Sequence, residues 1–432
     1  MKILRVGEKG FDRYLSAVEG RGTQGIFRFE REVRSILKDV KQRGDRALVH
    51  YTQVFDGLSI PIHQLRVKQS EVKEAYGKVP REFLETLKQA ARRIHLFHQL
   101  LGKRFLLPVK AKEKGIRLEQ MMRPLERVGI YVPGGKASYP STVLMAAIPA
   151  RAAGVQEVVM VTPPQKEGIS PAVLVAADLA GVDRIYRIGG VQAIAALAYG
   201  TKSVPKVDKI VGPGNQYVAT AKRLVYGEVD IDMVAGPSEI VIVSDESMPP
   251  SFVAADLISQ AEHDEMALAI LITNSEAFGR TVHQELERQL SSLKRRKVAS
   301  ESLRRRGAIL IVESLGQAMQ WVNRIAPEHL ELLVSRPFSL IKGVKHAGAV
   351  FLGPYTPEAI GDYMAGPNHI LPTAGTARFS SPLGVEDFIK RTNLVSFTQR
   401  ALGRFEKDVK RFSEREGLEG HSYAVQMRMK KP

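Results

Sequence analysis

The 432-residue sequence contains no cysteine, and this absence excludes several kinds of chemistry at once. A disulfide framework, a thiolate metal site and a cysteine nucleophile all require residues that the chain does not have. No stretch approaches the roughly 18 consecutive apolar residues of a membrane-spanning helix. The first residues, MKILRVGEKGFDRY, also lack the apolar segment of a secretory signal. We therefore expect a cytoplasmic protein with no membrane partner.

Acidic residues are scarce relative to basic ones, with 46 Asp and Glu against 63 Lys and Arg, which leaves a net charge of +17. Such an excess is typical of nucleic-acid-binding proteins. The basic residues are spread along the chain, however, and the densest run, residues 286–306, is typical of a solvated helix and its connection. Because no nucleic-acid-binding motif accompanies this run, we expect no nucleic-acid partner.

The order of strands and helices predicts an α/β fold. The length of 432 residues indicates two or more domains, and 44% apolar with 25% charged residues is ordinary for a globular protein. Helical spacing dominates up to about residue 105, and short strands then alternate with helices from residue 126. We expect two tandem, incomplete Rossmann-like parallel-sheet modules with helical N-terminal and C-terminal extensions. A ligand cleft between the modules would follow, and the helical segment from residue 384 is too short to form its own core.

Three glycine-rich turns follow predicted strands of the first α/β series. In VGPGNQYVATAKRL, Gly212 and Gly214 lie between a strand and a helix, where exposed backbone N–H groups can bind a phosphate. Tyr217 occupies the place of the third glycine in the dinucleotide fingerprint, so a tight structural turn explains this motif equally well. Together with the turns YVPGGKASYPS and IGGVQA, the motif favours a nucleotide-sized crevice.

Two short motifs carry groups suited to metal binding or proton transfer. In DLISQAEHDE, Gln260 and His263 are three residues apart and share one face of a helix. In APEHLEL, Glu328 is adjacent to His329, and the two could serve different proton transfers at one centre. A helix cap beside a surface histidine would explain the second motif without any catalysis.

Other polar pairs flank glycine-containing turns nearer the C-terminus. Asp362 and His369 surround a Gly-Pro turn, and Glu416 and His421 surround two glycines. His95 and His98 have a spacing that could bind a metal, but without a nearby carboxylate we interpret them as part of an ordinary helix face. The remaining histidines of this kind are expected to be structural: His50, His63, His283 and His346.

The longer motifs resemble those of the histidinol dehydrogenase family in order and spacing. They are IDMVAGPSEIVIV, DLISQAEHDE, APEHLEL, GDYMAGPNHILPTAGTARFSSPLGVEDF and EGLEGH, with GIYVPGGKASYPSTVLMAAIPARAAG and GPGNQYVATAKRLVYG before them. The resemblance extends over about residues 25–425. It implies a zinc-dependent, NAD-linked oxidation of L-histidinol to L-histidine through an aldehyde, the last steps of histidine biosynthesis.

The resemblance also assigns roles to individual residues. It implies one zinc per subunit and the following positions: metal ligands Gln260, His263, Asp362 and His421; proton transfer by Glu328 and His329; substrate contacts from Ser238, His369 and Glu416 together with Gln260, His263, His329, Asp362 and His421; and NAD contacts from Tyr131, Gln192 and Asn215. Two histidine nitrogens, a carboxylate and an amide oxygen suit zinc.

The resemblance further implies a homodimer with shared active sites. We expect an N-terminal extension over 1–24, a main domain of 25–131 and 238–383 with the metal and catalytic residues, an NAD-binding domain of 132–237, and a tail of 384–432 that completes the partner's site. Without cysteine, the aldehyde cannot be oxidised through thiolate attack, so we expect an aldehyde hydrate or another oxygen nucleophile. A zinc hydrolase, a relative acting on another amino alcohol and a basic binding protein remain alternatives.

Overall fold

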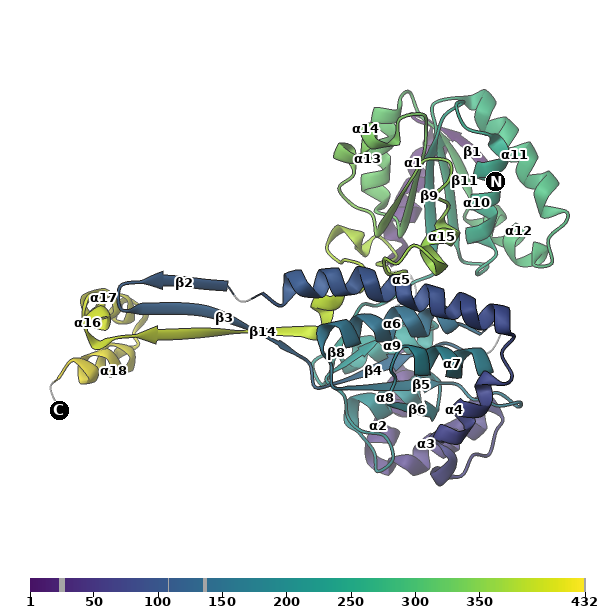
Figure 1. The fold of residues 1–432 in the computed structure, drawn as a ribbon. Helices are drawn as coiled ribbons and strands as arrows, with labels where there is room; N and C mark the ends of the chain where they lie inside the picture. The colour runs from purple at the N-terminus through teal and green to yellow at the C-terminus, as the bar shows by residue number, and fades with distance from the viewer. Residues whose placement is uncertain (23–27, 108, 135–137, 431–432) are drawn as a thin grey trace.

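The computed structural model describes residues 1–22, 28–107, 109–134 and 138–430. It consists of two α/β modules, one above the other in Figure 1, and a long arm that projects from the lower module. Each module contains one parallel sheet, which confirms the expected α/β fold. In the described residues, no helix has both the length and the apolar character that a membrane crossing requires.

The first module is built on a six-stranded parallel sheet in the order β1-β11-β10-β9-β12-β13. Its central strands EIVIVS and LAILIT are fully buried because helices cover both faces. The strands are β1 (Lys2–Arg5), β9 (Glu239–Ser244), β10 (Leu268–Thr273), β11 (Ala308–Ile311), β12 (His329–Leu333) and β13 (Ala349–Leu352). Helices α1 (Lys9–Glu19) and α13 (Leu315–Ile325) cover one face, and α10 (Pro250–Ala261), α11 (Glu276–Leu290) and α12 (Arg296–Arg305) cover the other.

The second module has a five-stranded parallel sheet in the order β6-β5-β4-β7-β8. The strands are β4 (Arg127–Tyr131), β5 (Glu157–Thr162), β6 (Arg184–Arg187), β7 (Lys209–Val211) and β8 (Asp230–Ile231). One face packs against α2 (Glu30–Arg43), α3 (Asp45–Asp56), α8 (Gly190–Tyr199) and α9 (Gln216–Val225). The opposite face packs against α4 (Gln69–Tyr76), α5 (Arg81–Phe105), α6 (Pro140–Ala153) and α7 (Pro171–Leu179).

The two sheets face each other with opposite ends of their strands. In the second module the chain reverses its strand order at β4 and β7, and the turns after these strands line the space between the modules. That position, beyond the carboxyl ends of parallel strands, is the usual ligand site of such sheets. The first module reverses at β9 and β12, but there the amino ends of the strands line the same space, through Ser238 before β9 and Glu328 before β12.

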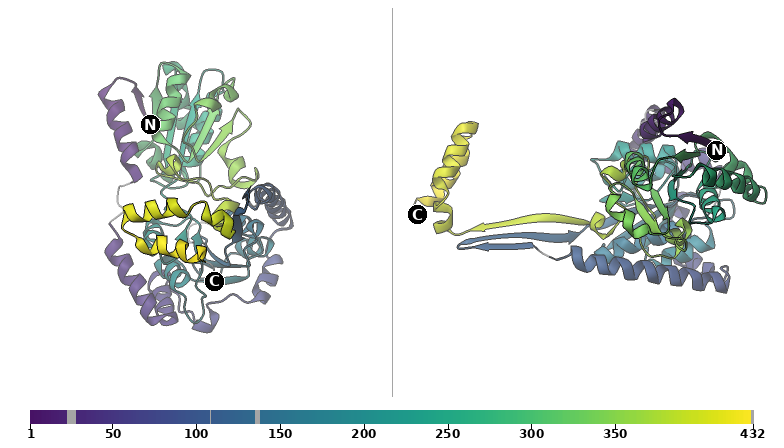
Figure 2. Two further views of the ribbon diagram at one scale, coloured as in Figure 1. Left: turned by 90° about the vertical axis from the view of Figure 1, so that its left-hand side faces the viewer. Right: turned by 90° about the horizontal axis from the view of Figure 1, so that it is seen from above.

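The arm is a three-stranded antiparallel sheet that carries three helices at its far end (Figure 2). Its strands are β2 (Val109–Glu113), β3 (Ile116–Pro124) and β14 (Ile389–Phe397), and nine residue pairs join β14 to β3. The helices α16 (Gln399–Gly403), α17 (Glu406–Glu416) and α18 (Glu419–Met429) contact one another and the end of this sheet, away from both modules.

Three sequence-based boundaries differ from the structure. The expected N-terminal extension, residues 1–24, contains two elements of the first module. Strand β1 pairs with β11, and helix α1 buries Phe11 in the core. The helices between residues 30 and 105 pack on the second module instead of joining residues 238–383, because their apolar faces match the sheet of 127–231. The expected helical tail from residue 384 begins with η5 (Val385–Phe388) and the nine-residue strand β14.

A candidate active site between the two modules

A cleft of about 540 Å³ lies between the two modules, and both contribute to its walls. The second module supplies the turns after β4 and β7, and the first supplies the amino ends of β9 and β12 and the end of α10. The sequence-predicted residues that line it are Asn215, Ser238, His263, Glu328, His329, Asp362 and His369. Residues that lie more than 100 positions apart in the chain therefore meet in one cavity.

Gln260 and His263 meet at the C-terminal end of α10, as their spacing predicted. Gln260 is fully buried and His263 is exposed in the following turn, with 3.0 Å between the Gln260 amide and His263 Nδ1. On its other side the Gln260 amide lies 3.1 Å from His329 Nδ1. The amide therefore lies between the imidazoles of His263 and His329.

Glu328 and His329 are held by the backbone of Glu239, the first residue of β9. The Glu239 N–H donates to Glu328 Oε2 at 2.8 Å, and its carbonyl oxygen lies 2.9 Å from His329 Nδ1. A carbonyl oxygen only accepts, so His329 carries its proton on Nδ1 and keeps the lone pair on Nε2. Both side chains are buried and line the cleft, which contradicts the alternative of a surface histidine.

Burial controls the charge of this pair. It lowers the pKa of His329 to about 3, so the ring is neutral at physiological pH. It also raises the pKa of Glu328 well above its ordinary value, although the hydrogen bond from the Glu239 backbone opposes that shift. The neutral imidazole keeps a lone pair that can accept a proton, and the Glu328 carboxyl lies beside it, 3.7 Å from Nδ1.

Asp362 enters the cleft from α15 (Glu358–Tyr363), one helical turn after Glu358. Burial raises the pKa of Asp362 to about 6, while nearby His263 lowers it. His329, Glu358 and Asp362 each have a ligand atom within 4.8 Å of the others. His369 donates through Nδ1 to the Asp362 carbonyl oxygen at 2.9 Å, which orients its ring.

These oxygen and imidazole donors fit a divalent cation. Burial raises the pKa of Glu358 well above its ordinary value, and Asp362 and Glu328 add like charges around it. A bound cation would stabilise the carboxylate forms, whose desolvation is otherwise uncompensated. Gln260, His263 and Asp362 together offer the mixed nitrogen and oxygen ligands of a zinc-type site.

In the second module, the three residues expected to contact NAD lie at or after the carboxyl ends of its strands. Tyr131 ends β4, Asn215 caps α9 after β7, and Gln192 lies in the first turn of α8 after β6. The Tyr131 hydroxyl accepts from the Gly190 N–H at 3.2 Å, next to Gln192. Gln192 is 1% exposed, yet neither its amide oxygen nor its nitrogen has a hydrogen-bond partner among the described residues. Buried polar groups are normally hydrogen-bonded, so the Gln192 amide has unused donors and acceptors for a ligand.

The glycines of the VGPGN turn are required by the turn itself. Gly212 has a φ of +111°, and a Cβ there would lie 2.2 Å from the Tyr131 carbonyl oxygen. Buried Lys222 donates to the Gly212 carbonyl oxygen at 2.8 Å and pairs with Asp232, whose other oxygen accepts from the Gly212 N–H at 2.7 Å. The structure therefore supports the interpretation as a tight structural turn, because the Gly212 N–H is bonded within the turn, and this turn borders the cleft.

Glu416 and His421 do not reach the cleft of their own chain. Glu416 ends α17 and His421 lies in α18, and both are exposed at the far end of the arm. His95 and His98, whose spacing could bind a metal, lie in α5. His98 is buried in α5 with Nδ1 bonded to the Ile94 carbonyl oxygen, and His95 is exposed on the same helix. They form part of an ordinary helix, as expected.

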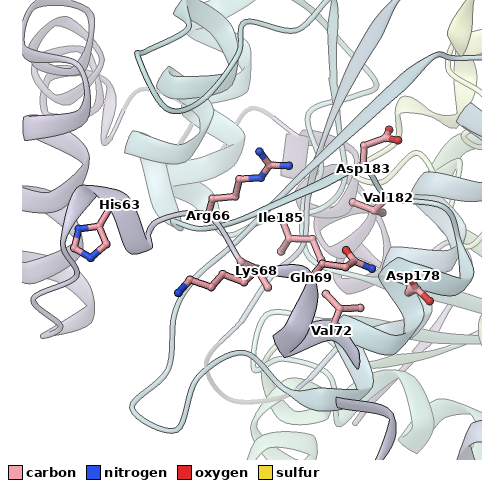
Figure 3. Close-up of a pocket in the computed structure, with 10 residues that line it drawn as sticks. His63, Arg66, Lys68, Gln69, Val72, Asp178, Val182, Asp183 and Ile185 are labelled. Carbon is pink, nitrogen blue, oxygen red and sulfur yellow. The ribbon is translucent and has the colours of Figure 1, made fainter. Parts of the chain in front are cut away.

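A second hollow of about 380 Å³ opens on the second module between the segment around Arg66 and α7 (Figure 3). Its charged residues are exposed, and two of them are already engaged, since Asp178 accepts from Tyr76 and Asp183 pairs with Arg151. None of the described side chains that line it is a buried polar group without a partner. The groups suited to catalysis therefore lie in the larger cleft.

Two residues in or behind the cleft were not predicted from the sequence. Glu358 had a detectable signal, because it precedes Asp362 by four residues and shares its helix face. Arg21, which forms a buried ion pair with Glu239 behind the cleft, had none, since 218 residues separate the two partners.

Comparison with known proteins agrees over nearly the whole chain. A family model described as histidinol dehydrogenase matches residues 20–429. The histidinol dehydrogenase of Syntrophotalea carbinolica is 53% identical over 430 residues, which cover 100% of this chain and 99% of that protein. That of Bacillus cereus is 54% identical over 399 residues, or 92% of each chain. The crystal structure of histidinol dehydrogenase from Elizabethkingia anophelis superposes with a TM-score of 0.92 at 35% identity, covering 99% of this chain and 98% of that one. The chain therefore belongs to the histidinol dehydrogenase family of oxidoreductases.

Proposed function

We propose that this protein is a zinc-dependent, NAD-linked enzyme that oxidises L-histidinol to L-histidine in two steps through the aldehyde. The observation that carries the proposal is that His263, Asp362, Glu328 and His329 line one cleft, with Gln260 buried beside His263. The carboxyl edge of a Rossmann-like sheet forms the opposite wall. We further propose a cytoplasmic enzyme of histidine biosynthesis.

Gln260, His263 and Asp362 would hold the zinc together with His421 of the partner subunit. Ser238 and His369 would contact the substrate within the cleft, and Glu416 of the partner subunit would contact it from the arm. Tyr131, Gln192 and Asn215 would contact NAD; Asn215 uses its Oδ1 to cap α9, so only its amide nitrogen is available to a ligand. When bound, zinc supplies a fixed positive charge that holds the substrate nitrogens, and NAD supplies the hydride acceptor.

The proton transfers follow from the fixed tautomer of His329. Its Nε2 accepts the hydroxyl proton of histidinol as the carbinol carbon is oxidised to the aldehyde. Glu328 then removes a proton from a water molecule as its oxygen adds to the aldehyde carbon, and His329 returns its proton to the aldehyde oxygen, which gives the diol. Nε2 of His329 accepts a diol proton as the second hydride leaves, which gives the carboxylic acid, and loss of its acidic proton gives the carboxylate. The two oxidations and the added water together release two hydrides and three protons.

The position of the arm supports a homodimer with shared sites. Glu416 and His421 are exposed far from the cleft of their own chain, and the arm helices expose large apolar side chains such as Phe412, at 73%, and Tyr423, at 59%. An apolar group of this kind at the end of an arm is suited to docking on another subunit. A two-fold dimer would bring each arm to the partner's cleft.

The proposal predicts that L-histidinol reduces NAD in a zinc-dependent reaction. With limiting substrate, about two NADH should form per histidinol, and a chelator should abolish the reaction until zinc is restored. Other amino alcohols, tested under the same conditions, distinguish a relative with a different substrate. Full activity of a demonstrably metal-free protein, or one NADH per substrate, would refute the proposal as stated.

A further inference from the structure

The N-terminal segment contributes a buried cation directly behind the cleft. Arg21, in η1 (Gly20–Gly22), has a side chain that is 3% exposed and donates to both carboxylate oxygens of Glu239, with 2.7 Å between Nη2 and Oε2. It also donates to the carbonyl oxygens of Val18 at 2.7 Å and Ile325 at 2.9 Å. A planar guanidinium presents several donors in a fixed fork, which suits it to holding three segments at once.

The residue that Arg21 holds is the one that orients both proton-transfer groups. The Glu239 N–H binds Glu328 and its carbonyl oxygen binds His329, while the Glu239 side chain lies on Arg21. Any movement of Glu239 would therefore move both groups. It would also break the hydrogen bond that keeps the His329 proton on Nδ1. A displacement of about 1 Å at such a site is enough to slow a reaction by on the order of 10²-fold.

Backbone strain around the same cluster supports this interpretation independently. Ala326 and Ala374 are the two non-glycine residues in the described chain with positive φ, at 48° and 56°. Ala326 follows Ile325, which accepts from Arg21, and the Ala374 N–H donates to Glu239 Oε1 at 3.2 Å. Such conformations persist only where surrounding contacts hold them, and they concentrate at functional sites.

We propose that Arg21 is a positioning residue of the active site, which holds Glu239 so that its backbone orients Glu328 and His329. The inference rests on the proposed function for these two residues. Arg21 itself touches neither the substrate nor the cofactor. It links the first helix of the chain, through Val18, to the end of α13 and the start of β9.

The test compares Arg21→Met and Arg21→Lys with a matched control, Arg324→Met. Arg324 joins the same two helices through Glu19 at 2.7 Å, but that pair is exposed and does not contact Glu239. All variants are purified with zinc, and kcat and KM are measured for histidinol and for the aldehyde. Thermal unfolding shows whether each variant remains folded. Nitrogen NMR of protein labelled at histidine reports the His329 tautomer, with His329→Gln for assignment.

We expect Arg21→Met to lower kcat for both oxidations by about 10²-fold, with KM little changed, and to lose the Nδ1-protonated tautomer of His329. Arg324→Met should match the wild type. Arg21→Lys should restore part of kcat, and it decides the question if Arg21→Met does not fold. Wild-type kcat in Arg21→Lys and Arg21→Met, or a lower kcat with an unchanged tautomer, would overturn the proposal. If the wild type does not oxidise histidinol, the proposed function fails, and the tautomer alone decides the role of Arg21.

Discussion

Two inactive variants should restore activity to each other if the active site is shared. His263→Ala removes a proposed ligand in the cleft, and His421→Ala removes the proposed ligand on the arm. The structure separates these two positions, because β3 and β14 pair over nine residues, so the sheet of the arm spans roughly 30 Å before α16 begins. Within one chain, His421 lies at the far end of that sheet.

The expected recovery follows from the two-fold arrangement. In a mixed dimer, one site combines the intact cleft of the His421→Ala chain with the intact arm of the His263→Ala chain. The other site carries both defects. With equal amounts and random exchange, half of the dimers are mixed and half of their sites are complete, so about a quarter of all sites become active.

The assay is NADH formation from L-histidinol after the variants are mixed under conditions that exchange subunits. Exchange is verified with two differently tagged chains, and zinc is measured in each sample. A matched control mixes His263→Ala with Asp362→Ala, both of which lie at the same cleft. Every cleft in that mixture carries a defect, so its activity should stay at background.

The outcome separates a shared site from a site built within one chain. If His421 completes the cleft of its own chain through a movement of the arm, every site in the first mixture retains a defect. Background activity after verified exchange would therefore refute the shared site. Equal recovery in the control mixture would also refute it, because recovery would then not depend on the arm.

Three further predictions follow from single side chains. Glu328→Gln removes the proposed water-activating base, so rapid kinetics should show the aldehyde step slowed by on the order of 10²–10⁴-fold and the alcohol step less. His329→Ala should slow both steps, and equal slowing by Glu328→Gln would contradict this division. Burial lowers the pKa of His98 below its ordinary 6.5, so protonation favours unfolding and stability is lost as the pH falls below 6.5. In urea titrations from about pH 7 to about pH 5, His98→Gln should lose less stability than the wild type. An unchanged dependence of stability on pH would refute this prediction. Lys222→Met leaves the buried carboxylate of Asp232 without its cation, so urea unfolding should show a free energy of unfolding lower by about 3–5 kcal/mol. Adding Asp232→Asn should restore part of that stability. A decrease of less than about 1 kcal/mol in Lys222→Met would contradict the prediction.

The sequence predicted the regular part of the fold because alternation of buried strands and helices is a local signal. The strands from β4 to β13 lie where apolar runs follow one another, as in EVVMVT and LAILIT. The arm had no such signal, since IRLEQMMRP contains only one buried residue and one of its two partner strands, β14, lies more than 260 residues further along the chain. The helices before residue 105 were recognised, but an amphipathic face does not indicate which of two sheets it covers.

The candidate site was predicted where short motifs and the family resemblance coincide. Spacing alone brought Gln260 near His263, and His263 lines the cleft with the pair Glu328 and His329. The contribution of Arg21 depends on contacts between distant segments, which no local pattern encodes. The first module also presents the amino ends of its strands to the cleft. The usual rule, that ligands bind at the carboxyl ends of parallel strands, would therefore have pointed to the opposite end of this sheet.

The pairing of β1 with β11 has a consequence for how the chain folds as it is synthesised. Lys2 is in register with Ala308, so the first strand leaves the ribosome about 300 residues before its partner. At roughly 5–20 residues per second, that interval is on the order of 15–60 s. The second module, whose strands lie between residues 127 and 231, is complete within that time and can fold first. By bringing its own entry and exit together, it would shorten the loop that β1 must close, so the middle of the chain serves as a scaffold for joining its beginning to its later part.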